Sequence, residues 1–129
     1  MDYPYDLGRY ARTVTTASPP AQIWFDRGLN WCFGYHHYEA VACFEKALEA
    51  DPHCAMAQWG IGYAAGPNYN FPWEWMDPAS KAASLARSYD AAHAALSVWR
   101  LTSRPASTGA LDEEAGSTRP GDEAPADDE

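Results

Sequence analysis

Basic residues are scarce in this sequence. Nine lysines and arginines stand against 18 aspartates and glutamates, which gives a formal net charge of −9 over 129 residues. A surface that binds nucleic acid or an anionic membrane needs concentrated positive charge. The composition therefore argues against both nucleic acid and membrane as partners.

Long apolar runs are also missing. No stretch of about 18 apolar residues occurs, so we expect no membrane-spanning helix. Residues 1–20 contain no continuous apolar segment of the kind found in secretory signals. The three cysteines are an odd number, which fits a reduced protein better than a disulfide framework. We therefore expect a cytoplasmic protein.

Aromatic residues are absent from the end of the chain. Residues 101–129 hold no Trp, Tyr or Phe and carry two bases against eight acids. Such a segment cannot bury enough apolar surface to offset its ordering entropy. We interpret it as a disordered acidic tail, either a solvated tail or the remnant of a truncated longer protein, rather than as an interaction arm. The expected organisation is an amino-terminal arm (1–20), a folded domain (21–100) and this tail (101–129).

Apolar residues recur at helical spacing in four stretches. Ser18-Pro19-Pro20 is a helix-start signature, and Asp77-Pro78 provides an N-cap with proline in the first turn. Asp51-Pro52 ends the second stretch, because the residue before proline disfavours helical backbone. The predicted helices cover residues 21–35, 37–50, 54–65 and 77–100. Short connections predict that neighbouring helices pack antiparallel.

The first two helices follow the tetratricopeptide-repeat pattern W-x2-L-G-x2-Y…A-x3-F…P. The matching residues are Trp24, Gly28, Trp31, Ala40, Phe44, Ala47 and Pro52. Gly28 and Ala40 would let the two helices approach closely while the aromatic side chains fill the space beside them. Arg27 replaces the leucine of the pattern, and a second, degenerate unit begins at Ala55.

Residues 5–75 resemble the amino-terminal part of a bacterial tetratricopeptide-repeat family. The shared phrases are Val14-Thr15-Thr16, residues 21–29, Glu39-Ala40, residues 44–47, residues 51–60 and residues 66–70. The resemblance implies an all-α fold, a tetratricopeptide-like stack of antiparallel helix hairpins with about four helices. It also implies a chain that usually continues in further helical pairs, and it brings no established reaction.

The fourth helix carries an apolar seam with intervals of three and four residues. The apolar seam consists of Ala82, Leu85, Tyr89, Ala92, Leu96 and Trp99. This spacing predicts that the helix packs along its whole length on a neighbour. A domain with fewer than two regular repeats is marginal by itself, so we also expect a homodimer through the Trp99 end.

In such a repeat stack, the first helix of each pair lines the concave face. By the resemblance, a protein or peptide partner would contact Gln22, Phe25, Asp26, Leu29, Cys32 and Phe33, followed by Met56, Trp59, Gly60 and Tyr63. Carboxylate-clamping repeat domains carry Lys and Asn where Phe25, Asp26 and Leu29 stand, so the face suits an apolar or aromatic segment. That segment is either a foreign peptide or the chain's own arm, which holds Tyr3, Tyr5, Leu7 and Tyr10.

The loop after the third helix is rich in aromatic residues. Residues 66–75 contain four of them together with Asn68 and Asn70. The loop is either a lip that closes over a ligand through Asn68, Asn70 and Trp73, or a plug over the open end of the stack. Large aromatics are more often buried than presented, which favours the plug, with the asparagines bonding turn backbone.

Metal-ligating and catalytic patterns are absent. No CxxC or HxxxH pair occurs, and packing explains Cys32, Cys43 and Cys54 as small apolar side chains. We therefore predict no metal and no cofactor. No glycine-rich phosphate loop or nucleophile motif occurs either, so we assign no catalytic residue.

We predict a non-catalytic protein-interaction module or scaffold of the tetratricopeptide type. One alternative is an enzyme or accessory subunit that uses the GPNYN loop (66–70) and the His36-His37 turn. The other is a structural cap of a longer solenoid.

Overall fold

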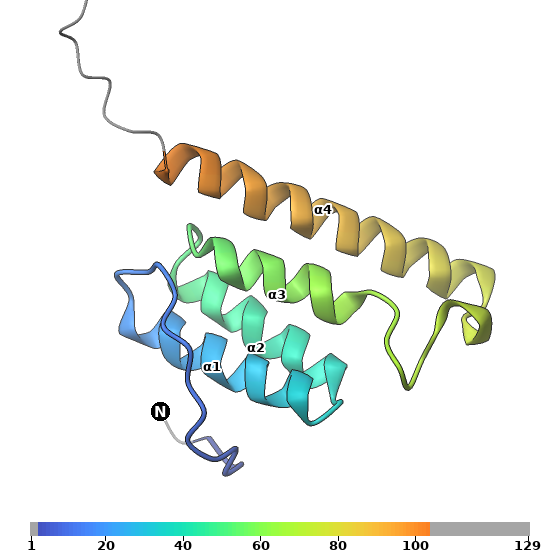
Figure 1. Cartoon of the computed structure of the whole chain (residues 1–129), viewed down its shortest axis with the longest axis horizontal. Coiled ribbons are helices and arrows are strands. Elements are labelled where there is room, and N and C mark those ends of the chain that lie inside the picture. The colour runs from blue at the N-terminus through green and yellow to red at the C-terminus, as the bar shows by residue number, and fades with distance from the viewer. Residues whose placement is uncertain (1–2, 104–129) are drawn as a thin grey trace, which may run out of the picture.

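A computed structural model describes residues 3–103, and within this range the chain forms four α-helices and a short 3-10 helix, η1 (Figure 1). The predicted all-α fold is confirmed. The elements are α1 (Pro19–Phe33), α2 (His37–Ala50), α3 (Ala55–Ala65), η1 (Trp73–Trp75) and α4 (Pro78–Thr102). The sequence predicts a tail from residue 101, but α4 continues to Thr102. Most of the predicted tail lies outside the described residues.

Capping side chains define the starts of α1 and α4. Ser18 Oγ accepts the backbone N–H of Ala21 at 3.4 Å. Asp77 Oδ1 accepts the N–H groups of Ala79 and Ser80, both at 2.9 Å. A proline follows each cap, where its missing N–H costs no helical hydrogen bond. These local signals explain why both helices begin within two residues of their predicted starts.

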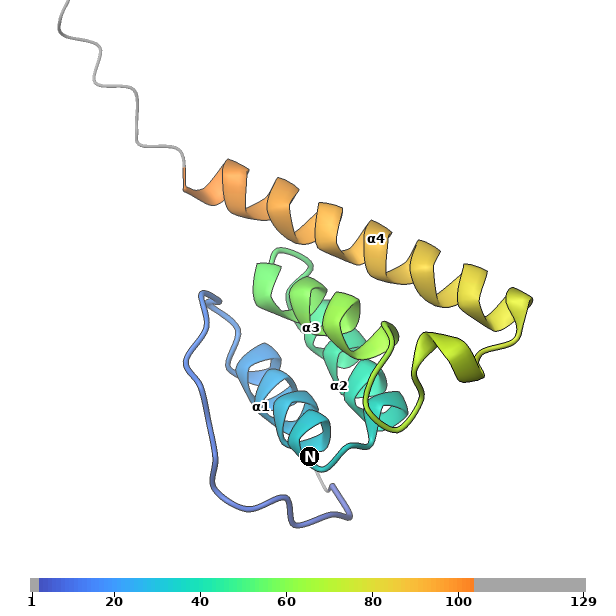
Figure 2. The ribbon, with the colours of Figure 1, turned by 45° about the vertical axis from the view of Figure 1, so that its right-hand side comes forward.

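The helices stack in chain order, each antiparallel to the one before (Figures 1 and 2). Helix α2 packs on α1 and α3, while α4 packs on α3 and forms the outermost layer. With 25 residues against 11, α4 extends beyond α3 (Figure 1). None of the helices between residues 3 and 103 has the length and apolar character needed to cross a membrane.

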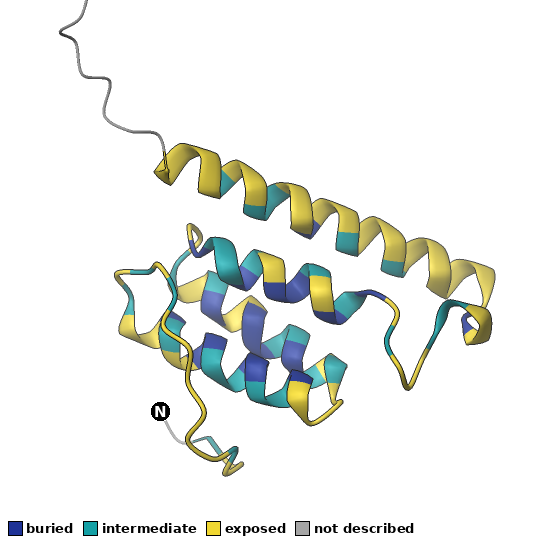
Figure 3. Ribbon diagram, in the orientation of Figure 1, coloured by how far each residue is buried: buried dark blue, intermediate teal, exposed yellow. Residues whose placement is uncertain are grey.

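The core lies where α1, α2 and α3 meet (Figure 3). Phe25 and Phe44 are fully buried with ring centroids 5.6 Å apart, and Leu29 and Cys32 are also buried. The expectation that Phe25 and Leu29 line a partner-binding surface is therefore wrong. In so small a stack, α2 and α3 cover this side of α1, and its apolar side chains become core.

The apolar seam is not the packed face of α4. Its four large members are exposed, as Figure 3 illustrates for most of the helix. Helix α4 instead faces α3 with small residues. Those least exposed are Ser84, Ser88, Ala91, Ala94, Ala95 and Val98. A Cβ added at Gly62 of α3 would lie 3.3 Å from the Ser88 carbonyl oxygen, so the backbones of α3 and α4 approach closely. The larger side chains of α4 therefore remain outside this contact. Among residues 3–103, the prediction that α4 packs on a neighbour through its seam is wrong.

Candidate functional site

The amino-terminal arm lies along α1 and is held by its main chain. The Arg12 N–H donates to Asp26 Oδ1 (2.9 Å), and the Arg12 carbonyl accepts from Gln22 Nε2 (2.9 Å). Gln22 Oε1 accepts the Val14 N–H (3.0 Å), and Asn30 Nδ2 donates to the Tyr10 carbonyl oxygen (2.9 Å). These three α1 side chains are spaced by four residues, so they share one helix face. We call Gln22, Asp26 and Asn30 the backbone-binding row.

Aromatic contacts anchor the start of the arm. The Tyr3 hydroxyl accepts a hydrogen bond from Trp31 Nε1 (2.7 Å) and lies 3.6 Å from Cys43 Sγ. Its ring packs edge-on against Trp24 at 5.4 Å, and the Arg27 guanidinium stacks over it at 4.1 Å. Burial raises the pKa of the Tyr3 phenol. Arg27, which replaces the leucine of the repeat pattern, thus joins the arm to α1 by a cation–π contact.

The chain's own arm is therefore the segment that occupies the α1 face. Further along it, Tyr10 packs edge-on against Phe33 with ring centroids 5.2 Å apart. Phe33 itself is exposed and does not belong to the core. Sequence reasoning named Gln22 and Asp26 but missed Asn30. The four-residue spacing that continues from Gln22 through Asp26 is the signal that would have found it.

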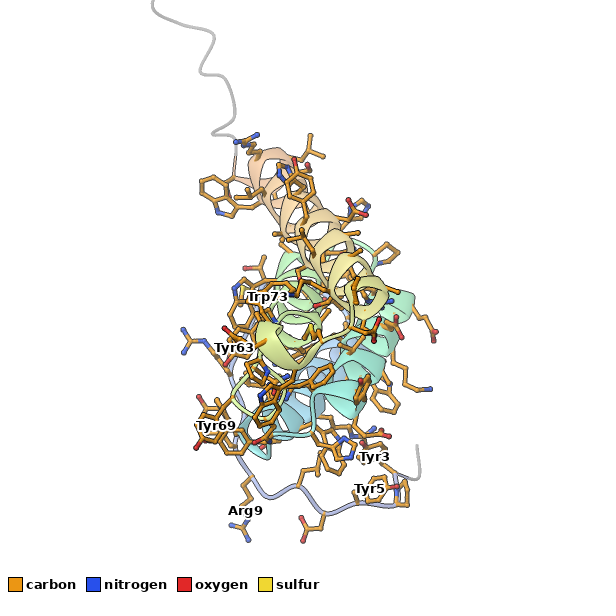
Figure 4. All side chains as sticks on the ribbon, turned by 90° about the vertical axis from the view of Figure 1, so that its right-hand side faces the viewer. Tyr3, Tyr5, Arg9, Tyr63, Tyr69 and Trp73 are labelled. Atoms are coloured by element: carbon orange, nitrogen blue, oxygen red, sulfur yellow. The ribbon has the colours of Figure 1, made fainter. Side chains whose placement is uncertain are left out.

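An aromatic pair on α3 remains uncovered. The Trp59 and Tyr63 rings are stacked, with centroids 5.4 Å apart and an interplanar angle of 16°. Their exposed fractions are 43% and 58%. Met56, by contrast, is half-buried against the core. Figure 4 places Tyr63 and Trp73 on the same side of the molecule. We call Trp59 and Tyr63 the aromatic platform.

Asn68 shapes the loop between α3 and η1. Its Oδ1 accepts the N–H groups of Asn70 (3.0 Å) and Phe71 (3.1 Å). This is the turn-forming role that the plug interpretation assigned to the asparagines. Tyr69 and Trp75, however, are 87% and 69% exposed, so the loop presents these aromatics to solvent. The plug interpretation is right for Asn68 and wrong for Tyr69 and Trp75.

A groove of about 810 Å³ lies on the α2 side of α4. It brings together the two features of the enzyme alternative, since His36 and His37 line it together with Asn68 and Asn70. Its apolar lining comes from α2, α3, the loop and α4. These residues include Val41, Ala42, Ala64, Ala65, Phe71, Met76 and Ala83. An ion pair between Glu45 of α2 and Arg87 of α4 joins its two sides.

His37 contacts the main chain through one ring nitrogen. Its Nδ1 lies 3.3 Å from the Tyr35 carbonyl oxygen. A carbonyl oxygen only accepts, so Nδ1 donates in this contact, and Nε2 bonds no other group of residues 3–103. Tyr35 has a φ of 60°, an uncommon conformation for a residue with a side chain. The His36 ring packs on Trp31 at 5.2 Å, and neither histidine ring caps α1.

The cysteines are buried thiols. Burial raises the pKa of Cys32 to about 11, with a smaller contribution from Cys43. Burial also raises the pKa of Cys43 and of Cys54. Thiols of raised pKa are poor nucleophiles and poor metal ligands. Between residues 3 and 103, no three His, Cys, Asp or Glu side chains lie close enough to hold a metal ion.

No protein-family model, curated protein or solved structure matches this chain. The tetratricopeptide resemblance of residues 5–75 therefore stays a prediction. The features of residues 3–103 that bear on function are the backbone-binding row, the aromatic platform and the groove.

Proposed function

We propose that the chain is a non-catalytic protein-interaction module whose α1–α3 face binds an extended segment of a partner protein. The observation that carries this proposal is the backbone-binding row, which holds the main chain of the chain's own arm, so a partner segment would take the place of the arm on α1. Contacts to main-chain groups do not depend on the bound sequence, so they supply affinity for extended segments in general. Side-chain pockets beside such contacts supply the specificity.

The core packing supports a tetratricopeptide-type hairpin as the framework. We propose that α1 and α2 form one repeat unit and that α3 opens a second, degenerate one. The Phe44 ring of α2 fills the space beside Gly28 of α1, as the large and small positions of the repeat pattern require, and it also lies beside Gly60 of α3. The unpaired cysteines support a reducing compartment such as the cytoplasm.

The aromatic platform defines the chemistry of the partner. Exposed Trp and Tyr rings supply large contact area at little conformational cost and are enriched among residues that dominate interface energy. Trp59 and Tyr63 are already stacked, so a partner side chain meets an ordered surface. The partner segment is therefore expected to carry an aromatic or aliphatic side chain at this point.

A peptide-library measurement tests the proposal. Labelled peptides of varied sequence are titrated against the full chain by fluorescence anisotropy. For peptides that bind, Trp59→Ala is expected to weaken affinity about tenfold or more, as for a central aromatic contact. Tyr38→Ala is the matched control, because Tyr38 is an exposed aromatic residue of α2 that lines the groove instead. Binding that is lost in Tyr38→Ala and kept in Trp59→Ala would contradict the proposal.

The groove supports a second candidate, a small-molecule site of an enzyme or accessory subunit. The specific observation is that His37 and Asn70 line the same largely apolar groove. Saturation-transfer NMR with a fragment library tests it. Hits at this site are expected to disappear in His37→Ala and Asn70→Ala, with helicity unchanged, and to persist in Tyr63→Ala. Hits that survive both groove variants would contradict the second candidate.

A further inference from the structure

The apolar seam of α4 is a regular surface that nothing in residues 3–103 covers. Tyr89 and Trp99 are 61% and 58% exposed, and Leu85 and Leu96 are exposed as well. Helix α4 is the outermost layer, and its packed line of small residues lies on another side of the helix. Contiguous exposed apolar surface of this kind marks interaction sites.

The seam is complementary to itself when two copies run antiparallel. Its intervals of 3, 4, 3, 4 and 3 residues read the same in both directions. In the antiparallel register that places Trp99 opposite Ala82 of a second copy, Tyr89 faces Ala92 and Leu85 faces Leu96. Each aromatic ring then meets an alanine, and each leucine meets a leucine. Alternation of large and small side chains across a helix pair is what allows the layers to interdigitate.

Charge and area also fit a second copy. No member of the seam is charged, so pairing buries no unpaired ion. Tyr and Trp side chains bury roughly 150–250 Å² each when fully covered, and Tyr89 and Trp99 still expose 61% and 58% of theirs. With the leucines and alanines added, two copies would bury on the order of 1,000 Å², which reaches the lower bound for a specific interface.

We infer that this protein forms a homodimer in which α4 packs antiparallel on α4 of a second copy along the apolar seam. The interface uses neither the backbone-binding row nor the aromatic platform. It is therefore independent of the proposed peptide binding, and either inference can fail without the other.

Light scattering of the full chain after size-exclusion chromatography tests the dimer. The expected mass is twice the 14.2 kDa of one chain. Leu96→Glu is expected to halve this mass while far-ultraviolet circular dichroism stays unchanged, because Leu96 is exposed in the single chain. Leu101→Glu is the matched control, since Leu101 is 73% exposed on the same helix but lies off the seam. If Leu96→Glu loses helicity, Trp99→Ala replaces it as the test variant, with the same expected loss of dimer.

A distance measurement tests the antiparallel register. A spin label at Arg100→Cys reports the separation of the two α4 carboxyl-terminal ends, since the native cysteines are buried. The register above places these positions about 28 Å apart along the helix axes, at 1.5 Å per residue. A monomeric wild type, a dimer that persists in Leu96→Glu or a dimer lost in Leu101→Glu would overturn the assignment of this face. A label separation well below 20 Å would overturn the antiparallel arrangement.

Discussion

The ring of Phe44 lies directly against Gly28, so that a Cβ added at Gly28 would be 2.6 Å from Phe44 Cε1. Gly60 of α3 lies against the same ring, and a Cβ added at Gly60 would be 2.7 Å from Phe44 Cε1. The ring therefore cannot move away from Gly28 without approaching Gly60. We expect Gly28→Ala to lower the free energy of unfolding by about 1–3 kcal/mol, because overpacking outweighs the helix-propensity gain of about 0.5–1 kcal/mol. Urea unfolding followed by circular dichroism measures this change.

Gly34→Ala is the control for this substitution. Gly34 has a φ of −80°, and the nearest atoms to an added Cβ are 3.5 Å away, so alanine fits. The free energy of unfolding is expected to stay within about 0.5 kcal/mol of wild type. Equal effects at both positions would contradict the close packing of Phe44.

The helix positions could be predicted because their signals are local. Prolines and capping residues act within a turn of the chain, and the predicted bounds of the second helix coincide with those of α2, His37–Ala50. The start of α4 at Pro78 follows from its cap in the same way. The first helix was expected over residues 21–35, and α1 instead begins at Pro19 and ends at Phe33.

The packed face of α4 could not be predicted from spacing alone. The periodic spacing of apolar residues shows that one face of a helix suits burial, but it does not show which neighbour covers that face. Ser88 and Ala91 make the contact with α3 because Gly62 permits close approach of the two backbones. Large seam residues such as Trp99 are thereby left outside.

The candidate site was predictable only in part. The repeat resemblance places Gln22 and Asp26 on the α1 face, but it also places Phe25 there, which the neighbouring helices cover. The role of Asn30 depends on the path of the arm across α1, which is a tertiary feature. His37 and Asn70 line one groove because of the path that the loop after α3 takes, which is likewise a tertiary feature.

Loss of Gln22 is expected to release the arm. Gln22 both accepts from the Val14 N–H and donates to the Arg12 carbonyl, so Gln22→Ala removes two hydrogen bonds to the arm, of about 1 kcal/mol each. Trypsin cleavage after Arg12 should then accelerate about tenfold or more, because the form in which the arm is detached from α1 becomes more populated. Gln58→Ala, at a half-buried glutamine of α3, should leave the cleavage rate unchanged. An unchanged rate in Gln22→Ala would show that this residue does not hold the arm.

The α4 cap should respond to acid. Hydrogen bonds from Ser80, first from its hydroxyl and then from its backbone N–H, hold the pKa of Asp77 below its ordinary value of 3.8. Because the folded-state pKa of Asp77 is lowered, its ionised carboxylate stabilises the folded chain above pH 3.8. This stabilisation is lost as the pH falls through the folded-state pKa. The amide resonances of Ala79 and Ser80, followed by NMR against pH, should titrate with a midpoint below 3.8.

Asp77→Asn separates the charge of the cap from its hydrogen bonds. Asparagine is as good an N-cap as aspartate, so α4 should remain capped at neutral pH. The acid titration of the Ala79 and Ser80 amides should disappear in this variant. A titration that persists unchanged would assign it to a carboxylate other than Asp77.

Cys32 should be protected from alkylation and should make stability fall at high pH. With a pKa raised by burial to about 11 against an ordinary 9.0, its thiolate fraction near pH 8 is about a hundredfold below normal. Iodoacetamide should therefore label Cys32 slowly in the folded chain and readily in urea, as read by mass spectrometry.

The raised folded-state pKa of Cys32 also means that its contribution to folding stability is retained below pH 9.0 and lost as the pH rises toward 11, because the unfolded chain releases the proton first. Cys32→Ala should remove this part of the alkaline loss, whereas rapid native labelling of Cys32 would place its thiol outside the core.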